Sequence, residues 1–234
     1  MRSGEFLAGI KAELPILVGV IPFGMIYGVL ALDAGMSTAQ AQAMSSMVFA
    51  GSAQIILTQL VHQGAPALVM LLTVLVVNLR HALYSASLAP FVQHLSTPWK
   101  LLLGYLLTDE AYAVTINHYT SNAADPPQPG RDYRHWFFLG AGLALWGSWQ
   151  LSTAAGILLG AVIPTSWSLD FALALTFIAL VIPNLKDRPG WAAALSAGLT
   201  ALLAYSLPYK LGLMLAAGVG ILAGLLVENL ETRR

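Results

Sequence analysis

Charged residues and cysteines are scarce in this chain of 234 residues. Lysine plus arginine number 11, as do aspartate plus glutamate, so charged residues make up 9% and the formal net charge is zero. An ordinary soluble domain carries about 25%. The absence of cysteine excludes disulfides, thiol nucleophiles and cysteine-ligated zinc. A chain without excess positive charge also lacks a basic surface for nucleic acid. Soluble globular, disordered and disulfide-stabilised secreted proteins are therefore excluded.

The chain contains long apolar stretches without charged residues. Apolar residues make up 57% of the chain, and the 46 residues 34–79 contain no charge. A helix needs about 20 mostly apolar residues to cross a bilayer. The sequence therefore predicts an all-α polytopic helical membrane protein with about eight transmembrane helices, some of them broken by proline or glycine. The predicted spans are residues 14–32, 44–61, 66–95, 101–117, 136–163, 168–183, 191–207 and 210–228.

Two of these spans, 66–95 and 136–163, could each be one helix or two. The positive-inside rule favours one helix for each, because a break inverts every loop that follows. With eight spans, the cytoplasmic segments hold eight of the eleven cations: Arg2, Lys11, Arg131, Arg134, Lys186, Arg188, Arg233 and Arg234. We therefore predict residues 1–13 as a cytoplasmic or interfacial segment, 14–228 as a single transmembrane domain and 229–234 as a cytoplasmic tail. No internal repeat is evident.

Three ionisable residues fall well inside predicted spans: Arg80, Asp109 and Glu110. A charge at the centre of a bilayer costs about 2.5–3.5 kcal/mol, so such groups face the bundle interior or a wet cavity. On a continuous helix over 101–117, Asp109 would share a polar stripe with Thr108 and Tyr112, and Glu110 would point about 100° away. We expect Asp109 to reach a cavity and to pair with Arg80. The alternative is that this ion pair only holds helices together.

Histidines offer a proton relay but no metal site. His81 could shuttle protons, because imidazole titrates near neutral pH, although a buried histidine with a structural hydrogen bond fits the pattern equally well. The five histidines lack a ligand spacing with a carboxylate partner. No nucleotide-binding loop of the G-x-x-x-x-G-K-[ST] type is present. We therefore predict no metal, no cofactor and no use of ATP by this chain.

Proline and glycine within two spans predict broken helices. Pro22, Phe23 and Gly24 lie in the middle of the first span, and Gly51, Ser52 and Gln54 belong to a small-residue stretch in the second. Irregular backbone in a membrane survives where it is buried or lines a cavity, and in transporters it exposes half-helix ends to the substrate. The alternatives are a harmless kink at Pro22 and packing faces at Gly24-x-x-x-Gly28, Gly156-x-x-x-Gly160 and Gly220-x-x-x-Gly224.

Four motifs in order resemble the AzlC family, the large subunit of branched-chain amino-acid exporters. They are Pro22-Phe-Gly24, Phe49-Ala-Gly-Ser-Ala-Gln54, Asn78-Leu-Arg-His-Ala-Leu-Tyr84 and Thr108-Asp-Glu110. The resemblance covers essentially the whole chain. It implies export of branched-chain amino acids, and in some members methionine, across the plasma (inner) membrane of a bacterium. It also implies a small AzlD-type membrane subunit of about half this size as partner.

The leading hypothesis is a secondary transporter that works by alternating access driven by proton entry, with both termini in the cytoplasm. A zwitterionic substrate needs a positive group for its carboxylate, an acceptor for its ammonium and an apolar slot. The predicted substrate-binding residues are Pro22, Phe23, Gly24, Gly51, Ser52, Gln54, Asn78, Arg80 and Trp146. The predicted proton-coupling residues are His81, Asp109 and Glu110.

Three other classes compete with this hypothesis. A structural or assembly subunit would use its buried polar residues only to hold helices together. An intramembrane enzyme could use His81 with Asp109, but the chain has no G-x-S-x-G or H-E-x-x-H motif, so we predict that it is not an enzyme. A passive channel is the third, since no sequence feature proves coupling to an ion. The expected partners are the small subunit, the amino acid and membrane lipid, without nucleic acid.

Overall fold

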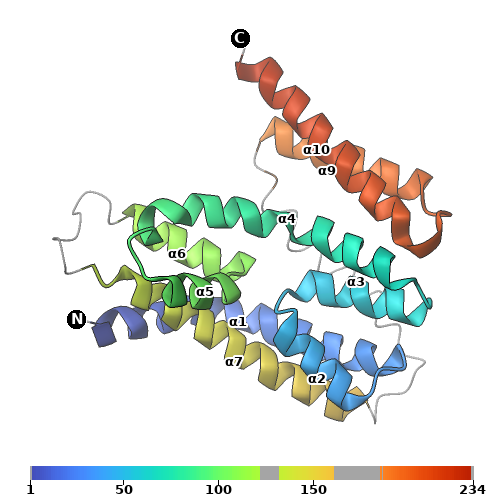
Figure 1. Cartoon of the computed structure of the whole chain (residues 1–234). Coiled ribbons are helices and arrows are strands. Elements are labelled where there is room, and N and C mark those ends of the chain that lie inside the picture. The colour runs from blue at the N-terminus through green and yellow to red at the C-terminus, as the bar shows by residue number, and fades with distance from the viewer. Residues whose placement is uncertain (1, 122–131, 161–184, 186, 233–234) are drawn as a thin grey trace. The chain divides into compact units, whose positions relative to one another are not determined.

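The computed structural model describes residues 2–121, 132–160, 185 and 187–232 (Figure 1). The regular structure in these ranges is helical, which confirms the all-α prediction. The elements are α1 (Arg2–Asp33), α2 (Thr38–Met47), α3 (Gly51–His62), α4 (Ala67–Val92), α5 (Thr97–Tyr105), α6 (Asp109–Ser121), α7 (Arg134–Gly160), α9 (Arg188–Leu203), the short 3-10 helix η2 (Pro208–Lys210) and α10 (Leu211–Thr232).

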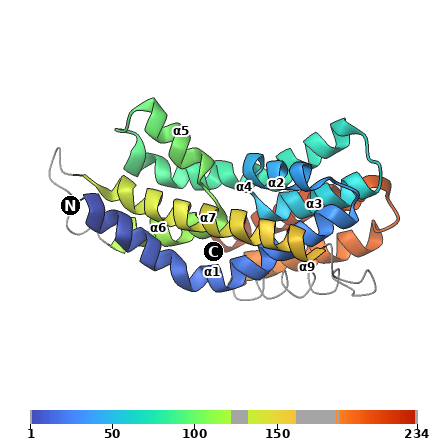
Figure 2. The same ribbon diagram turned by 90° about the horizontal axis from the view of Figure 1, so that it is seen from below.

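The chain forms two compact units, one from residues 1–58 and 77–165 and the other from 59–76 and 166–234. In the first unit α1 and α7 lie side by side along most of their length, as Figures 1 and 2 both show. The helices α2 and α6 pack against this pair. In the second unit α10 packs on α9. The prediction of a single transmembrane domain over 14–228 concerns the whole chain and stays a prediction.

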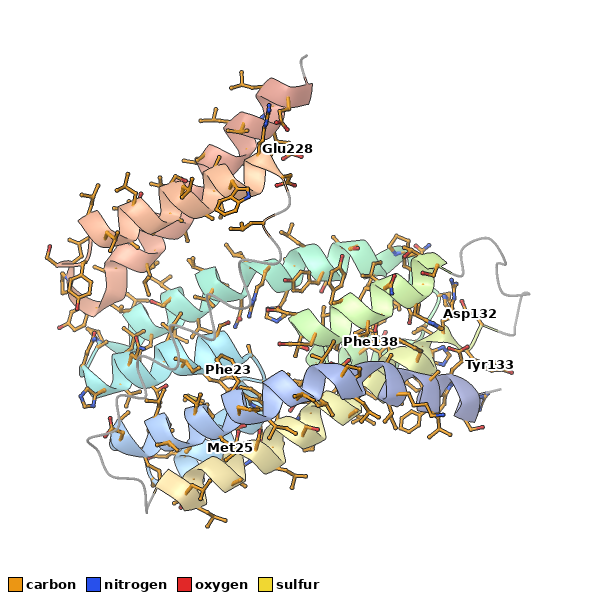
Figure 3. The ribbon with its side chains drawn as sticks, turned by 180° about the vertical axis from the view of Figure 1, so that it is seen from behind. Phe23, Met25, Asp132, Tyr133, Phe138 and Glu228 are labelled. Atoms are coloured by element: carbon orange, nitrogen blue, oxygen red, sulfur yellow. The ribbon has the colours of Figure 1, made fainter. Side chains whose placement is uncertain are left out.

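Glycines allow the close approach of α1 and α7. A Cβ atom at Gly28 would overlap the backbone of α7 around Gly156, and one at Gly156 would overlap the backbone of Met25. Phe23 and Met25, labelled in Figure 3, flank Gly24 on α1. Small residues permit such contacts between membrane helices, where packing replaces the hydrophobic driving force. The first two small-residue motifs are therefore packing faces. In the second unit, Gly220 and Gly224 of α10 similarly face Ala193 of α9.

The helix α1 continues through Pro22, so the expected break in the first span is wrong. Both Pro15 and Pro22 lie inside α1, and Pro22 is exposed. A proline in a membrane helix is tolerated when neighbouring helices hold the backbone in place. Here the contact with α7 at Gly24 and Gly28 supports α1 directly after Pro22. The helix also begins at Arg2, so residues 2–13 continue into the first span without an interruption.

Two ambiguous spans are resolved in favour of one helix each. Helix α4 covers the span predicted at 66–95 without a break near Asn78, and α7 covers 136–163 as far as Gly160. Among the described residues, three helices are long and apolar enough to cross a membrane: Arg2–Asp33, Ala67–Val92 and Leu211–Glu231. The spans predicted at 191–207 and 210–228 correspond to α9 and α10, and the one at 168–183 lies outside the described residues. The count of eight stays a prediction.

The spans at 44–61 and 101–117 are each divided into two helices by three residues. Residues 48–50 separate α2 from α3, and residues 106–108 separate α5 from α6. The first break was expected from Gly51, whereas the second was not. The polar stripe drawn along a continuous helix over 101–117 is therefore wrong, because Asp109 is the first residue of a new helix.

The order of helices in residues 2–121 is repeated in tandem. A long helix followed by a broken helix occurs first as α1 and α2–α3, and then as α4 and α5–α6. Three corresponding boundaries are 59 residues apart: the long helices end at 33 and 92, the broken helices begin at 38 and 97, and they end at 62 and 121. The expectation that the chain has no internal repeat is corrected by this arrangement. Transporter folds are commonly built from such repeats, with discontinuous helices at the binding site.

Candidate functional site

The break between α2 and α3 places Gly51 and Ser52 at a helix N-terminus inside the first unit. The first bond of α3 runs from the Gln54 amide to the Ala50 carbonyl at 3.0 Å. A Cβ atom at Gly51 would lie 2.8 Å from ring atoms of both Phe23 and Trp149, so glycine is needed for this close packing. Gly51 is thus a packing residue that fixes where α3 starts.

The break between α5 and α6 places Asp109 and Glu110 in the first turn of α6. The hydroxyl of Thr108 accepts a hydrogen bond from the Ala111 amide at 3.3 Å and so caps this helix. The N-terminus of a helix carries a partial positive charge that stabilises acidic side chains there. The break therefore offsets part of the cost of placing two carboxylates within a predicted membrane span.

Arg80 of α4 joins the two helix N-termini. Its Nη1 atom donates to Asp109 Oδ2 in an ion pair, and its Nη2 atom donates to Ser52 Oγ at 2.7 Å. These three residues come from α4, α6 and α3, and we call them the Arg80 cluster. The predicted approach of Arg80 to Asp109 is thus present in the structure, and Ser52 joins it.

The Arg80 cluster is partly exposed and retains unused hydrogen-bonding groups. The side chains of Arg80 and Asp109 are 33% and 35% exposed. The Nε atom of Arg80 and the Oδ1 atom of Asp109 are buried and have no hydrogen-bond partner among the described residues. One donor and one acceptor thus remain beside a cation and an anion. Such a pair matches the carboxylate and ammonium of a zwitterion.

Tyrosines and polar residues of α4 and α6 continue along the same contact. The Tyr112 hydroxyl donates to Ser87 Oγ at 3.0 Å, and the ring of Tyr112 stacks on that of Tyr84 with centroids 4.4 Å apart. His81 Nδ1 lies 3.2 Å from the Asn78 carbonyl of its own helix, and its ring meets Tyr84 edge-on. Asn78 is next to this turn, with its Oδ1 atom buried and unpartnered among the described residues. His81 and Asn78 therefore lie close in sequence and structure to Arg80.

The remaining predicted substrate residues lie elsewhere in the first unit. Phe23 packs against Trp149 of α7 at 5.7 Å between ring centroids, and Gly24 contacts Ser152. Gln54 is fully buried, and no described atom satisfies its side-chain amide. The structure places none of these side chains in hydrogen-bond contact with the Arg80 cluster. The rings of Phe23 and Trp149 instead form the packing around the start of α3.

Trp146 serves a different contact from the one predicted. Its Nε1 atom donates to the Tyr105 hydroxyl at 2.7 Å, and that hydroxyl donates to the Ser46 carbonyl at 2.6 Å. Ser46 is the next-to-last residue of α2 and Tyr105 is the last residue of α5, so these two hydrogen bonds connect the first halves of both broken helices with α7. Sequence reasoning missed Tyr105 in this role because a continuous helix over 101–117 would turn it toward Asp109.

A second polar seam connects α2 with α7. Gln42 Nε2 donates to Gln150 Oε1 at 2.8 Å, and the hydroxyls of Ser45 and Thr153 are 2.9 Å apart. Hydrogen bonds between membrane helices hold them together where lipid offers no alternative partner. The hydrogen bonds between α2 and α7 are thus contacts of helix packing. Among the described residues, no group of three or more histidine, aspartate or glutamate side chains is placed to hold a metal ion.

Comparison with known proteins identifies the family of this chain. The profile described as "AzlC protein" matches residues 15–163, which is more than half of the chain. The chain belongs to the AzlC family. The matched range contains both broken helices and the whole Arg80 cluster, so the AzlC signature and the candidate site coincide. AzlC is a transport-associated family, and the enzyme alternative finds no support in it.

Relatives of this AzlC chain are membrane proteins over nearly its full length. An "Uncharacterized membrane protein" of Archaeoglobus fulgidus is 31% identical, with 94% of each chain covered. "Inner membrane protein YgaZ" of Escherichia coli K12 is 26% identical over 95% of this chain and 87% of its own. "Branched-chain amino acid transport protein AzlC" of Bacillus subtilis is 25% identical over 83% and 74%. No solved structure matches the chain.

Proposed function

We propose that this AzlC chain is the large subunit of a secondary transporter that exports branched-chain amino acids, with methionine as a further substrate, from the cytoplasm across the plasma membrane. The observation that carries the proposal is the Arg80 cluster, in which a guanidinium and a carboxylate each retain one unused hydrogen-bonding atom. The transport function named for the Bacillus subtilis relative supports the substrate class. A small AzlD-type membrane subunit acts as the partner.

Substrate recognition follows from the charges of a free amino acid. The substrate carboxylate binds Arg80 and the N-terminus of α3 beside Ser52, where the helix dipole adds positive potential. The substrate ammonium binds Asp109, whose Oδ1 atom is unpartnered among the described residues. A charge-assisted hydrogen bond contributes about 1.5–3 kcal/mol, so the two ends together provide most of the orientation. Asn78 and His81, which share a turn with Arg80, complete the polar side of the site.

The tandem broken helices provide a route to alternating access. Each broken helix consists of two half-helices, one of which can move relative to the other. In many transporters the binding site lies where the ends of such half-helices meet. Inward proton movement gains about 2.3 kcal/mol per 100 mV of membrane potential, which is enough to drive export. We propose that both termini lie in the cytoplasm, as the positive-inside rule predicts.

Counterflow of labelled leucine tests the proposal. The full chain is reconstituted with its small partner, and Arg80→Gln and Asp109→Asn are compared with Arg188→Gln. Arg188 is a matched control because it belongs to an exposed ion pair with Glu231 at 3.9 Å. We expect both cluster variants to retain the partner but lose counterflow, whereas the control transports normally. Unchanged counterflow in both cluster variants would refute the site.

The second candidate is a structural or assembly subunit, favoured by the contacts of Arg80 with two other helices. It predicts that Arg80→Met combined with Asp109→Leu keeps the complex functional, because paired apolar residues can replace an ion pair without loss of stability. The transport proposal predicts a stable complex without counterflow in the same double variant. One protein preparation thus separates the two candidates.

A further inference from the structure

Glu13 of α1 is a buried acid to which sequence reasoning assigned no role. Its side chain has 0% exposure, and neither carboxyl oxygen has a hydrogen-bond partner among the described residues. The residue lies one turn after Gly9, where α1 approaches the backbone of α7 at Phe137 too closely for any side chain. The packing of α1 on α7 therefore encloses this carboxyl group instead of leaving it beside solvent.

The charged group that acts on Glu13 is a second carboxyl group, that of Glu110. Helices α1 and α6, which carry the two residues, pack together, and a negative charge on Glu110 disfavours a second negative charge on Glu13. Glu110 is adjacent in sequence to Asp109, but the pairing with Arg80 is made by Asp109 alone. Two carboxyl groups that repel each other cannot both ionise freely, and one proton on either of them relieves the repulsion.

Among the described residues, the cation that acts on Glu110 is Arg80, which is already paired with Asp109, and Lys11, two residues before Glu13 on α1, is exposed. Helix α2 has no titratable residue, and α7 has none from Trp136 to Gly160. On α6 the charged neighbour of Glu110 is Asp109, with Arg80 beyond it, and His118 at the other end of α6 pairs with Glu5 at 3.0 Å. The remaining titratable groups of α6 are the phenols of Tyr112 and Tyr119. A proton is therefore the ligand that this arrangement accommodates best.

We propose that Glu13 and Glu110 form a carboxyl pair that binds the transported proton, separate from the Arg80 cluster that binds the amino acid. The inference rests on the proposed function and deepens it by naming the coupling site. When the pair takes up a proton, one of the two carboxylates becomes a neutral carboxylic acid and the repulsion between them is relieved. No covalent bond other than the O–H bond of that acid forms or breaks, and the proton returns to water on release.

Coupling follows from the position of Glu110 beside Asp109. Loss of the proton adds one negative charge next to the carboxylate that receives the substrate ammonium, which strengthens amino-acid binding. Uptake of the proton removes that charge and weakens binding. Proton and amino acid therefore favour opposite states of the site, which is the requirement for exchange of one for the other.

The first part of the test detects the proton without any transport. Infrared spectra of the purified full chain at neutral pH are compared for the wild type, Glu13→Gln and the control Glu231→Gln. We expect the carbonyl band of a protonated carboxylic acid in the wild type and the control, and its loss in Glu13→Gln. Absence of that band, or its persistence in Glu13→Gln, would overturn the inference even if the chain transports leucine.

The second part separates coupling from binding in proteoliposomes. Leucine exchange at equal pH requires no net proton movement, whereas accumulation into vesicles that are acidic inside requires protons to leave as leucine enters. We expect Glu13→Gln to retain exchange at saturating leucine but to accumulate no more leucine than empty vesicles do. Accumulation equal to that of the wild type would overturn the inference. Loss of exchange in the wild type itself would refute the proposed function and leave the infrared result to decide the proton site.

A third variant distinguishes a proton carrier from a structural residue. Glu13→Asp retains an acid in a shorter side chain, whereas Glu13→Gln retains the shape without the acid. A proton carrier predicts that Asp preserves part of the accumulation and Gln none. The reverse order would show that shape alone matters and would overturn the inference. If Glu13→Gln fails to purify as a folded chain, Glu110→Gln replaces it, and it must lose accumulation while retaining exchange.

Discussion

Asp109 and Glu110 are neighbours in the first turn of α6, yet their surroundings differ in every respect that matters for a charge. Asp109 is paired with Arg80, about a third exposed, and has one oxygen left for a ligand. Glu110 makes no ion pair in the described structure and acts on the fully buried carboxyl group of Glu13 on α1. One carboxyl group is thus paired with a cation, and the other interacts with a second acid.

This difference shows how one helix turn can serve two ligands. A 100° step between successive residues sends adjacent side chains to different helices. The first carboxylate then pairs with Arg80, and the second belongs to the proposed acid pair, whose charge depends on protonation. A charge change at the second site is felt at the first because the two are one residue apart. The following predictions test how far the two environments are distinct.

The largest expected effect is a loss of leucine exchange when a residue of the Arg80 cluster is replaced. Arg80→Gln and Asp109→Asn each remove one charge-assisted hydrogen bond to the substrate, worth about 1.5–3 kcal/mol. Leucine exchange at low substrate concentration should therefore fall about tenfold to a hundredfold. Initial rates of labelled leucine uptake against leucine concentration measure this effect. If Glu13→Gln lowered exchange to the same extent, the two sites would not be separable.

The carboxyl pair should depend on the close packing of α1 against α7. Gly9→Leu introduces a side chain where α7 leaves no room, which costs about 1–3 kcal/mol of stability. The shift of α1 separates Glu13 from Glu110, so gradient-driven accumulation should fall more than exchange does. Gly4→Leu is the control, because nothing lies within 4 Å of a Cβ atom there. Equal loss of both activities would contradict the separation of the sites.

Thermal unfolding should distinguish Asp109 from Glu13 by the direction in which replacing each residue changes the stability. Asp109→Asn leaves the guanidinium of Arg80 without its anion and should lower the stability by about 1 kcal/mol, a modest value because the pair is partly exposed. Glu13→Gln removes an acid that lacks a hydrogen-bond partner in the described structure and should leave the unfolding midpoint unchanged or raise it. Midpoints in one detergent measure both. A lower midpoint in Glu13→Gln than in Asp109→Asn would reverse the comparison.

A third carboxylate, outside the membrane spans, should give the smallest effect. Asp132 precedes α7 beside Tyr133, as Figure 3 shows, and accepts hydrogen bonds from Arg134. Partial burial acts to raise the pKa of Asp132, but the hydrogen bonds and charge of Arg134 outweigh it and hold that pKa below its ordinary value of 3.8. The pair therefore stabilises the folded state above pH 3.8, and this contribution is lost as pH falls further.

Asp132→Asn should accordingly lower the stability at neutral pH by about 0.5 kcal/mol. The difference from the wild type should shrink as the pH drops below 3.8. Unfolding midpoints of both proteins over a series of pH values measure this convergence. A difference that grows in acid would mean that Arg134 is not the group that stabilises the carboxylate.

Sequence reasoning identified the Arg80 cluster because membrane burial makes charges costly. Arg80 and Asp109 stood out as ionisable residues inside apolar spans, and Ser52 belonged to a recognised small-residue stretch. The same reasoning overlooked Glu13, which lies at the edge of the first span beside Lys11 and resembles an ordinary interfacial acid in sequence. Its burial comes from the close approach of α7 to α1 at Gly9. The residue of α7 that makes this contact, Phe137, lies more than 120 residues further along the chain.

The breaks in the helices were predicted in part. Gly51 indicated the start of α3 correctly, but Pro22 lies inside a continuous α1, and the break before Asp109 has neither proline nor glycine within it. Local propensity failed at these two places because contacts with α7 support α1 after Pro22, and because Arg80 pairs with Asp109 where α6 begins. The tandem repeat escaped notice because it is a repeat of helix order, although Ser37-Thr38 and Ser96-Thr97 begin both broken helices at the same 59-residue interval.

The sequence by itself determined that this is an all-α membrane protein of the AzlC family, since apolar length and the scarcity of charge leave few other solutions. It also singled out the charges that must be accommodated within the spans. Only the tertiary structure decided that Arg80 meets both Asp109 and Ser52, and that Glu13 is fully buried. Partner choice depends on where each helix starts and how closely its neighbours approach, and those quantities arise from packing between segments far apart in the chain.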